Sequence, residues 1–167
     1  CDKSKLPEMY QTDNDYATIL RFAIRSALID AVKIEGSLDE DDIDDIAGQA
    51  VDLGSVPIIV IRADQGAKAD ELVQKMESRW DLEAKTFELA VPVQTKEDIQ
   101  ALEDAAKAFH EAHHDATVIP HPIGKIAKEA MLQGQTFGAP LLYTTDGEET
   151  ETLPTSTAIH KLLHPEE

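Results

Sequence analysis

Residues 56–61 read Val-Pro-Ile-Ile-Val-Ile, and this run decides the fold class. A short, unbroken apolar run is typical of a strand that is buried on both faces of a sheet. Residues 86–93 form a second predicted strand, with Phe87, Leu89 and Val91 on one face. Helical periodicity separates the two runs, so the sequence predicts a βαβ unit and an α/β domain.

Before residue 55 the sequence predicts only helices. Apolar residues recur every three or four positions over residues 15–34, and a second helix is expected over residues 37–54, with Ser37 as its N-cap. Residues 1–14 are polar and aperiodic, which indicates a tether. The expected organisation is therefore a tether over 1–14, a helical segment over 15–54 and an α/β domain over 55–164.

The C-terminal third predicts a helix, a hairpin and a closing helix. Pro122 is suited to the first turn of a helix, and Asp146-Gly147 is typical of a tight turn between antiparallel strands. The strands of this hairpin are expected at residues 141–143 and 150–153. Pro154 and Thr155 then open the last helix.

These C-terminal motifs carry a resemblance to a known family. The stretches 123–130, Phe137-Gly-Ala-Pro140-Leu-Leu-Tyr143 and 159–163 resemble the tail of the DsbC/DsbG group of thioredoxin-like proteins. The resemblance implies an α/β, thioredoxin-like fold (βαβ–α–ββα) with two preceding N-terminal helices. It also implies that Pro140 occupies the cis-proline position of that family.

The same resemblance implies a protein without redox activity. Residues 62–68, which follow the first strand, replace the family's Cys-x-x-Cys motif, and disulfide exchange needs two thiols. What remains is a groove that binds extended polypeptide. We expect Pro140, Ala139, Asp64 and Gln65 to be its partner-binding residues.

The charge of the chain limits its partners. The formal net charge is −18 at pH 7, which disfavours nucleic acids and anionic membrane surfaces. No apolar run reaches the roughly 18 residues needed to cross a bilayer. Strong acidity is also typical of proteins from salt-loving organisms, so an ordinary acidic domain from a halophile is one alternative.

Cys1 is the only cysteine, so no internal disulfide forms. Three interpretations remain open: a lipidated lipoprotein cysteine, an N-terminal nucleophile, and an artificial chain end. The polar residues after Cys1 favour lipidation. Localisation is then expected in the cell envelope, on the periplasmic or extracellular face, with membrane contact through the lipid alone.

A histidine cluster suggests a second function. His110, Glu111 and His114 match the HExxH pattern, in which two histidines one helical turn apart bind zinc and the glutamate is a general base. With His121 as a further ligand, the cluster predicts a zinc or copper site, or a zinc metallohydrolase. The opposing interpretation is a helix end at which histidines favour the dipole.

The leading hypothesis is therefore a non-enzymatic, redox-inactive thioredoxin-like lipoprotein that serves as a structural or partner-binding subunit of an envelope complex. It expects no cofactor beyond a covalent lipid on Cys1. The two alternatives are the metal-binding protein or metallohydrolase and the halophilic domain.

Overall fold

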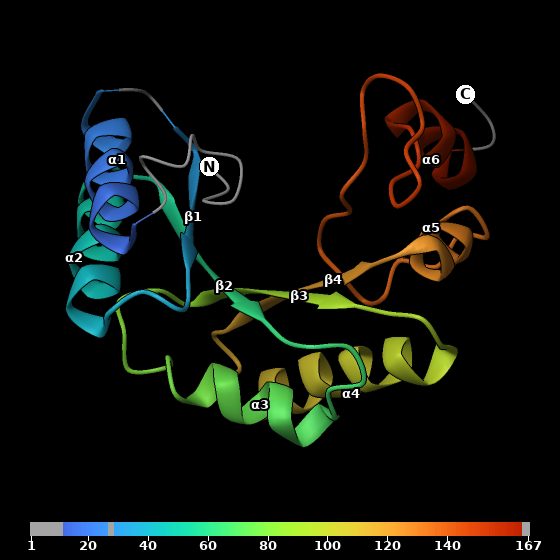
Figure 1. The fold of residues 1–167 in the computed structure, drawn as a ribbon, viewed down its shortest axis with the longest axis horizontal. Coiled ribbons are helices and arrows are strands. Elements are labelled where there is room, and N and C mark those ends of the chain that lie inside the picture. The colour runs from blue at the N-terminus through green and yellow to red at the C-terminus, as the bar shows by residue number, and fades with distance from the viewer. Residues whose placement is uncertain (1–11, 27–28, 165–167) are drawn as a thin grey trace.

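The computed structural model describes residues 12–26 and 29–164 and shows a single parallel sheet (Figure 1). Its strands run in the order β1-β2-β3-β4, and each pairs in parallel with the strand that precedes it in sequence. The strands are β1 (Ala31–Glu35), β2 (Val56–Arg62), β3 (Thr86–Pro92) and β4 (Thr117–Ile123). The helices are α1 (Asp13–Ser26), α2 (Glu40–Asp52), α3 (Ala69–Glu77), α4 (Lys96–Ala112), α5 (Lys125–Met131) and α6 (Ser156–Leu163).

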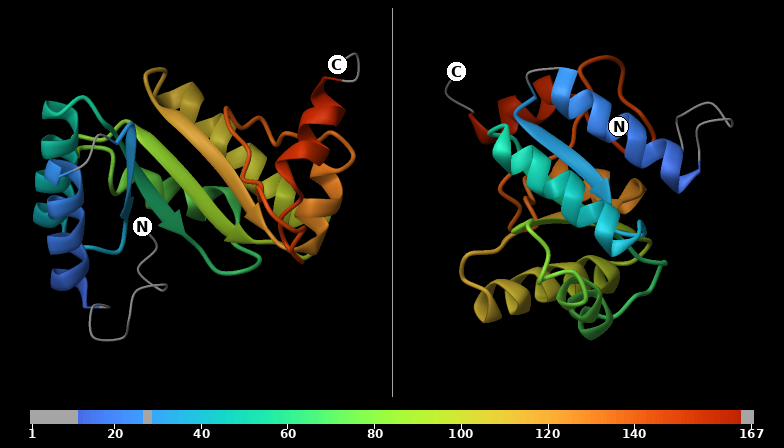
Figure 2. Two further views of the ribbon diagram at one scale, coloured as in Figure 1. Left: turned by 90° about the horizontal axis from the view of Figure 1, so that it is seen from above. Right: turned by 90° about the vertical axis from the view of Figure 1, so that its left-hand side faces the viewer.

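The helices are distributed along a curved sheet. α1 and α2 lie at the end of the sheet formed by β1, and α5 and α6 lie at the end formed by β4 (Figure 2). α3 and α4 lie beneath the central strands in Figure 1. Consecutive parallel strands joined by helices on one side of a curved sheet are the architecture of part of a (βα)8 barrel.

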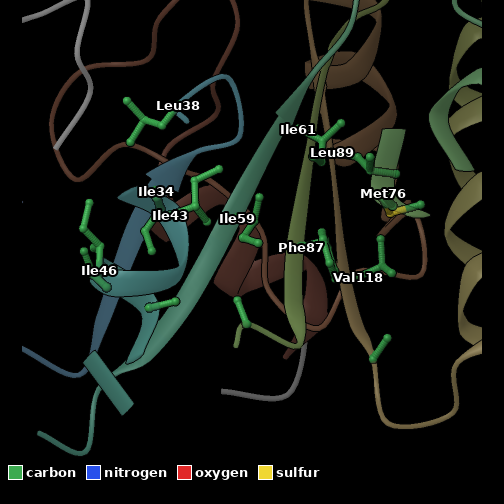
Figure 3. Close-up of a cluster of buried hydrophobic side chains, with 14 of the residues drawn as sticks. Ile34, Leu38, Ile43, Ile46, Ile59, Ile61, Met76, Phe87, Leu89 and Val118 are labelled. Atoms are coloured by element: carbon green, nitrogen blue, oxygen red, sulfur yellow. The ribbon is translucent and has the colours of Figure 1, made fainter. Parts of the chain in front are cut away.

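The main hydrophobic core lies between the sheet and α1–α4. Alternate strand residues, including Ile34, Ile59, Phe87 and Val118, point into it (Figure 3). Trp80 contacts this core, where its ring is 6.2 Å from that of Phe87. Because side chains alternate along a strand, the residues between these positions face the opposite side of the sheet, which we call the inner face.

The thioredoxin-like fold is wrong. That fold needs an antiparallel hairpin, whereas all strand pairings in the described sheet are parallel. Residues 141–153 form no strand, and the nearby bridge between Thr145 and Thr155 is itself parallel. Pro140 is not a cis-proline, since every described peptide bond is trans.

The predicted helix over residues 15–34 is also wrong in its second half. α1 ends at Ser26, and Ala31 begins a strand. The spacing of Ala31 and Ile34 suits a helix, but Val32 and Ile34 also alternate with charged residues, as in a strand, and pairing with β2 decides between the two. We expected a helical segment over 15–54 and an α/β domain over 55–164. β1 lies in the first range and β2 in the second, so one sheet spans both.

Several other elements follow their local signals, whereas Pro122 lies in β4 and not in the first turn of a helix. β2 and β3 lie where the apolar runs predict them, and Thr95 caps α4 with Asp98 at its third position. Thr155 caps α6. α2, by contrast, is capped by Asp39 and not by Ser37, because the Asp39 side chain accepts from the backbone N–H of Asp41.

Candidate functional site

A polar cluster occupies the inner face of the sheet. Glu88 of β3 lies at its centre and is 3% exposed. Lys33 of β1 approaches its Oε2 atom at 2.6 Å, and His121 of β4 places Nδ1 2.8 Å from its Oε1 atom. Tyr143, from the segment between α5 and α6, donates its hydroxyl to Oε2 at 2.5 Å. We call these four residues the inner-face cluster.

The three donors keep Glu88 ionised. Burial alone would raise the pKa of this carboxyl group, because it removes water from the charged form. The hydrogen bonds from His121, Lys33 and Tyr143 outweigh that effect and lower the pKa of Glu88 to about 2. At neutral pH the centre of the cluster is therefore a carboxylate.

The charge of Glu88 sets the direction of the hydrogen bonds that its neighbours form with it. Burial raises the pKa of Tyr143, and the hydrogen bond to Glu88 raises it further, so this phenol stays neutral. A carboxylate only accepts hydrogen bonds, so His121 must carry its proton on Nδ1. The Nε2 atom of neutral His121 is then the basic nitrogen.

Ring contacts join three members of the cluster. The ring of Tyr143 stacks on the imidazole of His121, with 4.0 Å between their centres. The Nζ atom of Lys33 lies 4.0 Å from the centre of the same tyrosine ring. A cation over the face of an aromatic ring is attracted by its negative π surface.

A second ion pair lies at the carboxyl ends of β1 and β2. Arg62 donates to both oxygens of Glu35, at 2.9 and 2.7 Å. The carboxyl edge of a parallel α/β sheet is where such folds bind their ligands. Lys33 and Glu35 are two residues apart on one strand, so the inner-face cluster and this pair face the same side.

The predicted metal ligands do not come together. His110 directs Nδ1 to the carbonyl oxygen of Ala116, whereas His121 is bonded to Glu88. His114 is exposed, and its ring centre is 6.2 Å from that of His110. Residues 12–26 and 29–164 contain no group of three or more His, Cys, Asp or Glu residues that could hold a metal ion.

The predicted partner-binding residues are also separated. Ala139 and Pro140 line a groove with Ala116 and Thr117, at the start of β4. Asp64 and Gln65 follow the carboxyl end of β2. In a parallel sheet these are opposite edges, so the four residues do not share one groove.

Cys1 and most of the expected tether lie outside the described residues, and lipidation stays a prediction. In the described part of the chain, no helix is both long enough and apolar enough to cross a membrane.

Sequence reasoning found only one member of the inner-face cluster. His121 was predicted, but as a metal ligand. Lys33 and Glu88 interrupt apolar strands, between Val32 and Ile34 and between Phe87 and Leu89. A charged residue inside an otherwise apolar strand is the signal that would have indicated a buried polar site.

Comparison with known proteins gives a consistent result. The family model described as type I 3-dehydroquinase matches residues 2–166. The curated 3-dehydroquinate dehydratases of Salmonella paratyphi B and Salmonella heidelberg are each 28% identical over 134 residues, which are 79% of this chain and 53% of theirs. The chain thus spans about half the length of these relatives.

Solved structures of the same kind share the fold. The type I 3-dehydroquinate dehydratase of Clostridium difficile, solved with covalently modified comenic acid, superimposes with a TM-score of 0.77 at 19% identity. It matches 93% of this chain and 63% of its own. The 3-dehydroquinate dehydratase of Enterococcus faecalis gives a TM-score of 0.72 at 17% identity, over 93% of this chain and 62% of its own.

These matches overturn the functional hypotheses drawn from the sequence. The resemblance to the DsbC/DsbG group was wrong, and with it the redox-inactive envelope lipoprotein. The metalloprotein and halophilic-domain alternatives are not supported either. The misleading signal was the run of short C-terminal motifs, which does not specify how strands pair.

Proposed function

Because the chain belongs to the type I 3-dehydroquinase family, we propose that it acts as a lyase on a hydroxylated cyclic keto acid of the 3-dehydroquinate type. The names of the curated relatives and of the solved structures support this substrate class. The reaction is the elimination of water.

One observation carries the proposal. The carboxylate of Glu88 holds Nδ1–H of His121 at 2.8 Å, so the basic Nε2 atom is oriented by a buried anion. A carboxylate that fixes the tautomer and ring orientation of a histidine is a recurrent arrangement for general-base catalysis. The His121 side chain is 20% exposed and therefore accessible to a small ligand.

The cluster suits the elimination of water from a β-hydroxy ketone. Nε2 of His121 takes the proton next to the carbonyl group, and the electrons of that C–H bond form an enolate. The enolate then collapses, the C–O bond to the β-hydroxyl breaks, and the same proton leaves with the oxygen as water. Lys33 supplies a positive charge beside the enolate oxygen.

Lys33 acts in this proposal as a charge and not as a nucleophile. Its Nζ atom lies 2.6 Å from the Glu88 carboxylate, and a lysine ammonium has no lone pair. The Clostridium difficile enzyme carries a covalently modified ligand. We expect no covalent adduct at Lys33, which borohydride treatment in the presence of substrate followed by intact-mass measurement tests.

Ultraviolet absorbance tests the activity itself, since the elimination converts a ketone into a conjugated enone. The purified protein is expected to produce the enone from 3-dehydroquinate, and His121→Gln is expected to lower kcat at least a hundredfold. His114→Gln, at an exposed position, is the matched control and should keep full activity. Absence of enone formation by the wild-type protein, or full activity of His121→Gln, would refute the proposal.

A further inference from the structure

A small pocket outside the inner-face cluster collects positive charge. It has a volume of about 210 Å³ and lies between the turn after β1, the carboxyl end of β2 and the end of α3. Its polar walls come from Gly36, Ser37, Arg62, Lys75, Ser78 and Arg79. Because α3 packs on the helical side of the sheet, this pocket is built from residues that the proposed lyase chemistry does not use. Arg62 also belongs to the ion pair at the carboxyl ends of β1 and β2.

The charge of this pocket is opposite to that of the chain. The whole sequence has 15 Lys and Arg residues against 33 Asp and Glu residues, yet three of those cations line this one pocket. Glu35 is the acidic residue among its walls, and Arg62 binds both oxygens of that carboxylate. Arg79 likewise pairs with the carboxylate of Glu40, so the local excess of positive charge is carried by Lys75.

Arg79 is held in place before any ligand arrives. Its Nε atom donates to the carbonyl oxygen of Gly36 at 3.1 Å, and its Nη1 atom donates to Oε1 of Glu40 at 2.6 Å. The side chain is only 20% exposed. A guanidinium group that is already oriented loses little conformational entropy when it binds an anion.

Lys75 is the third cation in the lining of the pocket. It is exposed on α3 and forms no ion pair with any residue that the structure describes. Ser78 donates its hydroxyl to the carbonyl oxygen of Lys75, which ties the two residues together at the end of the helix. Ser37 adds a second hydroxyl from the opposite wall.

The wall formed by Gly36 cannot carry a side chain. A Cβ atom at this position would lie 2.9 Å from the carbonyl oxygen of Val60. The turn after β1 therefore packs directly on β2, and its backbone N–H donates to the same oxygen at 2.9 Å. This close packing brings Ser37 and Arg79 to the same small volume.

We propose that this pocket binds a small tetrahedral oxyanion of the phosphate class. Lys75 on α3, Arg62 on β2, Arg79 just after α3 and the hydroxyl of Ser37 surround the space, and donors from several sides suit a tetrahedral anion better than a planar one. Guanidinium and ammonium groups are the usual protein ligands of phosphate. The site is separate from the inner-face cluster, so its occupancy does not depend on the proposed lyase activity.

Isothermal titration of the full chain with inorganic phosphate, in chloride buffer of constant ionic strength, tests the proposal. Saturable binding of one phosphate per chain is expected, and Lys75→Ala should weaken it at least tenfold. Lys107→Ala removes a lysine that is 76% exposed on α4 and serves as the charge-matched control. Its phosphate affinity should equal that of the wild-type chain.

Two further arms make the outcome decisive. Sulfate should compete with phosphate, whereas acetate should not. Arg79→Lys, which keeps the charge but removes the oriented guanidinium, should weaken binding although its unfolding temperature in chloride shows that it folds. Equal affinity of Lys75→Ala and Lys107→Ala, absence of saturable binding, or equal binding of acetate would each overturn the proposal.

Discussion

Lys33 and Glu88 form an ion pair across a strand that lies between them. Lys33 is on β1 and Glu88 is on β3, while β2 separates these two strands in the sheet. The 2.6 Å contact therefore passes over the inner face of β2, where Val60 is 3% exposed. The pair therefore links the edge strand β1 to β3 on the face of the sheet opposite the main core.

Removing the charge of Glu88 should destabilise the fold. Glu88→Gln removes a carboxylate that is only 3% exposed and leaves the partly exposed Lys33 without its counter-ion, so we expect a loss of about 3 kcal/mol in the free energy of unfolding. Urea denaturation followed by the fluorescence of Trp80 measures this loss.

A double substitution measures how strongly Lys33 and Glu88 stabilise each other. Lys33→Met combined with Glu88→Gln removes both charges and should cost less than the sum of the two single changes. Glu129→Gln, on a side chain that is 55% exposed, should change stability by less than about 0.5 kcal/mol. Strict additivity of the two single changes would show that the ion pair contributes nothing.

The low pKa of Glu88 predicts how stability depends on pH. Its pKa is about 2 in the folded chain against an ordinary value of 4.5. The folded state thus gains stability from Glu88 above pH 4.5, and loses that gain as the pH falls toward 2. The full difference corresponds to about 3 kcal/mol.

A comparison of variants isolates this effect from the titration of other acids. The stability difference between wild type and Glu88→Gln should be constant between pH 5 and 7 and should shrink between pH 4.5 and 2.5. Urea unfolding at each pH gives the difference. A gap that does not narrow on acidification would mean that another group causes the acid sensitivity.

Two glycines should respond to alanine in opposite ways. Gly124 has φ 149°, and a Cβ atom there would lie 2.5 Å from the carbonyl oxygen of Val93. Gly124→Ala is therefore expected to cost about 2 kcal/mol or more. Gly48 lies within α2, where an added Cβ atom would meet nothing within 4 Å, so Gly48→Ala should add about 0.5–1 kcal/mol. Thermal unfolding of both variants checks the sign of each change.

Arg21 links α1 to α2 through two carboxylates. Its guanidinium lies 2.6 Å from Asp42 and 2.7 Å from Asp45, and these contacts lower the pKa of Asp45. Arg21→Ala should cost about 1 kcal/mol in dilute buffer and less in molar salt, which screens partly exposed charges.

Arg25 provides the control for this salt dependence. Arg25 lies on α1, as Arg21 does, and its Nε atom donates to the neutral side chain of Gln49 on α2 at 3.0 Å. Arg25→Ala should therefore cost less and should change less between low and high salt, because its charge acts on Asp45 without a direct hydrogen bond. Equal salt dependence of the two variants would indicate that general screening, and not the Arg21 contacts, governs the response.

Local sequence signals predicted the elements that depend on local physics. The apolar run at Val56 and the alternation at Phe87 indicated β2 and β3, and the Thr95–Asp98 capping box indicated the start of α4. These signals involve residues a few positions apart. They do not specify which strands pair, so the C-terminal motifs were assigned to a hairpin that the structure lacks.

β1 and the inner-face cluster depend on distant contacts. Val32 and Ile34 become a strand because β2 lies beside them, and Lys33 meets Glu88 only once the sheet has curved. Tyr143 reaches the same carboxylate from 55 residues away. No spacing rule relates such positions, so a single sequence shows them only as polar residues within or beside apolar runs.

The consecutive order of the strands has a consequence for synthesis. As the chain leaves the ribosome, each new strand finds its partner already present, so the sheet can grow one βα unit at a time with short loop closures. Tyr143 emerges after β4, and its bond to Glu88 must form after that growth. The polar centre of the inner face is thus completed late in folding, when the helical side is already packed.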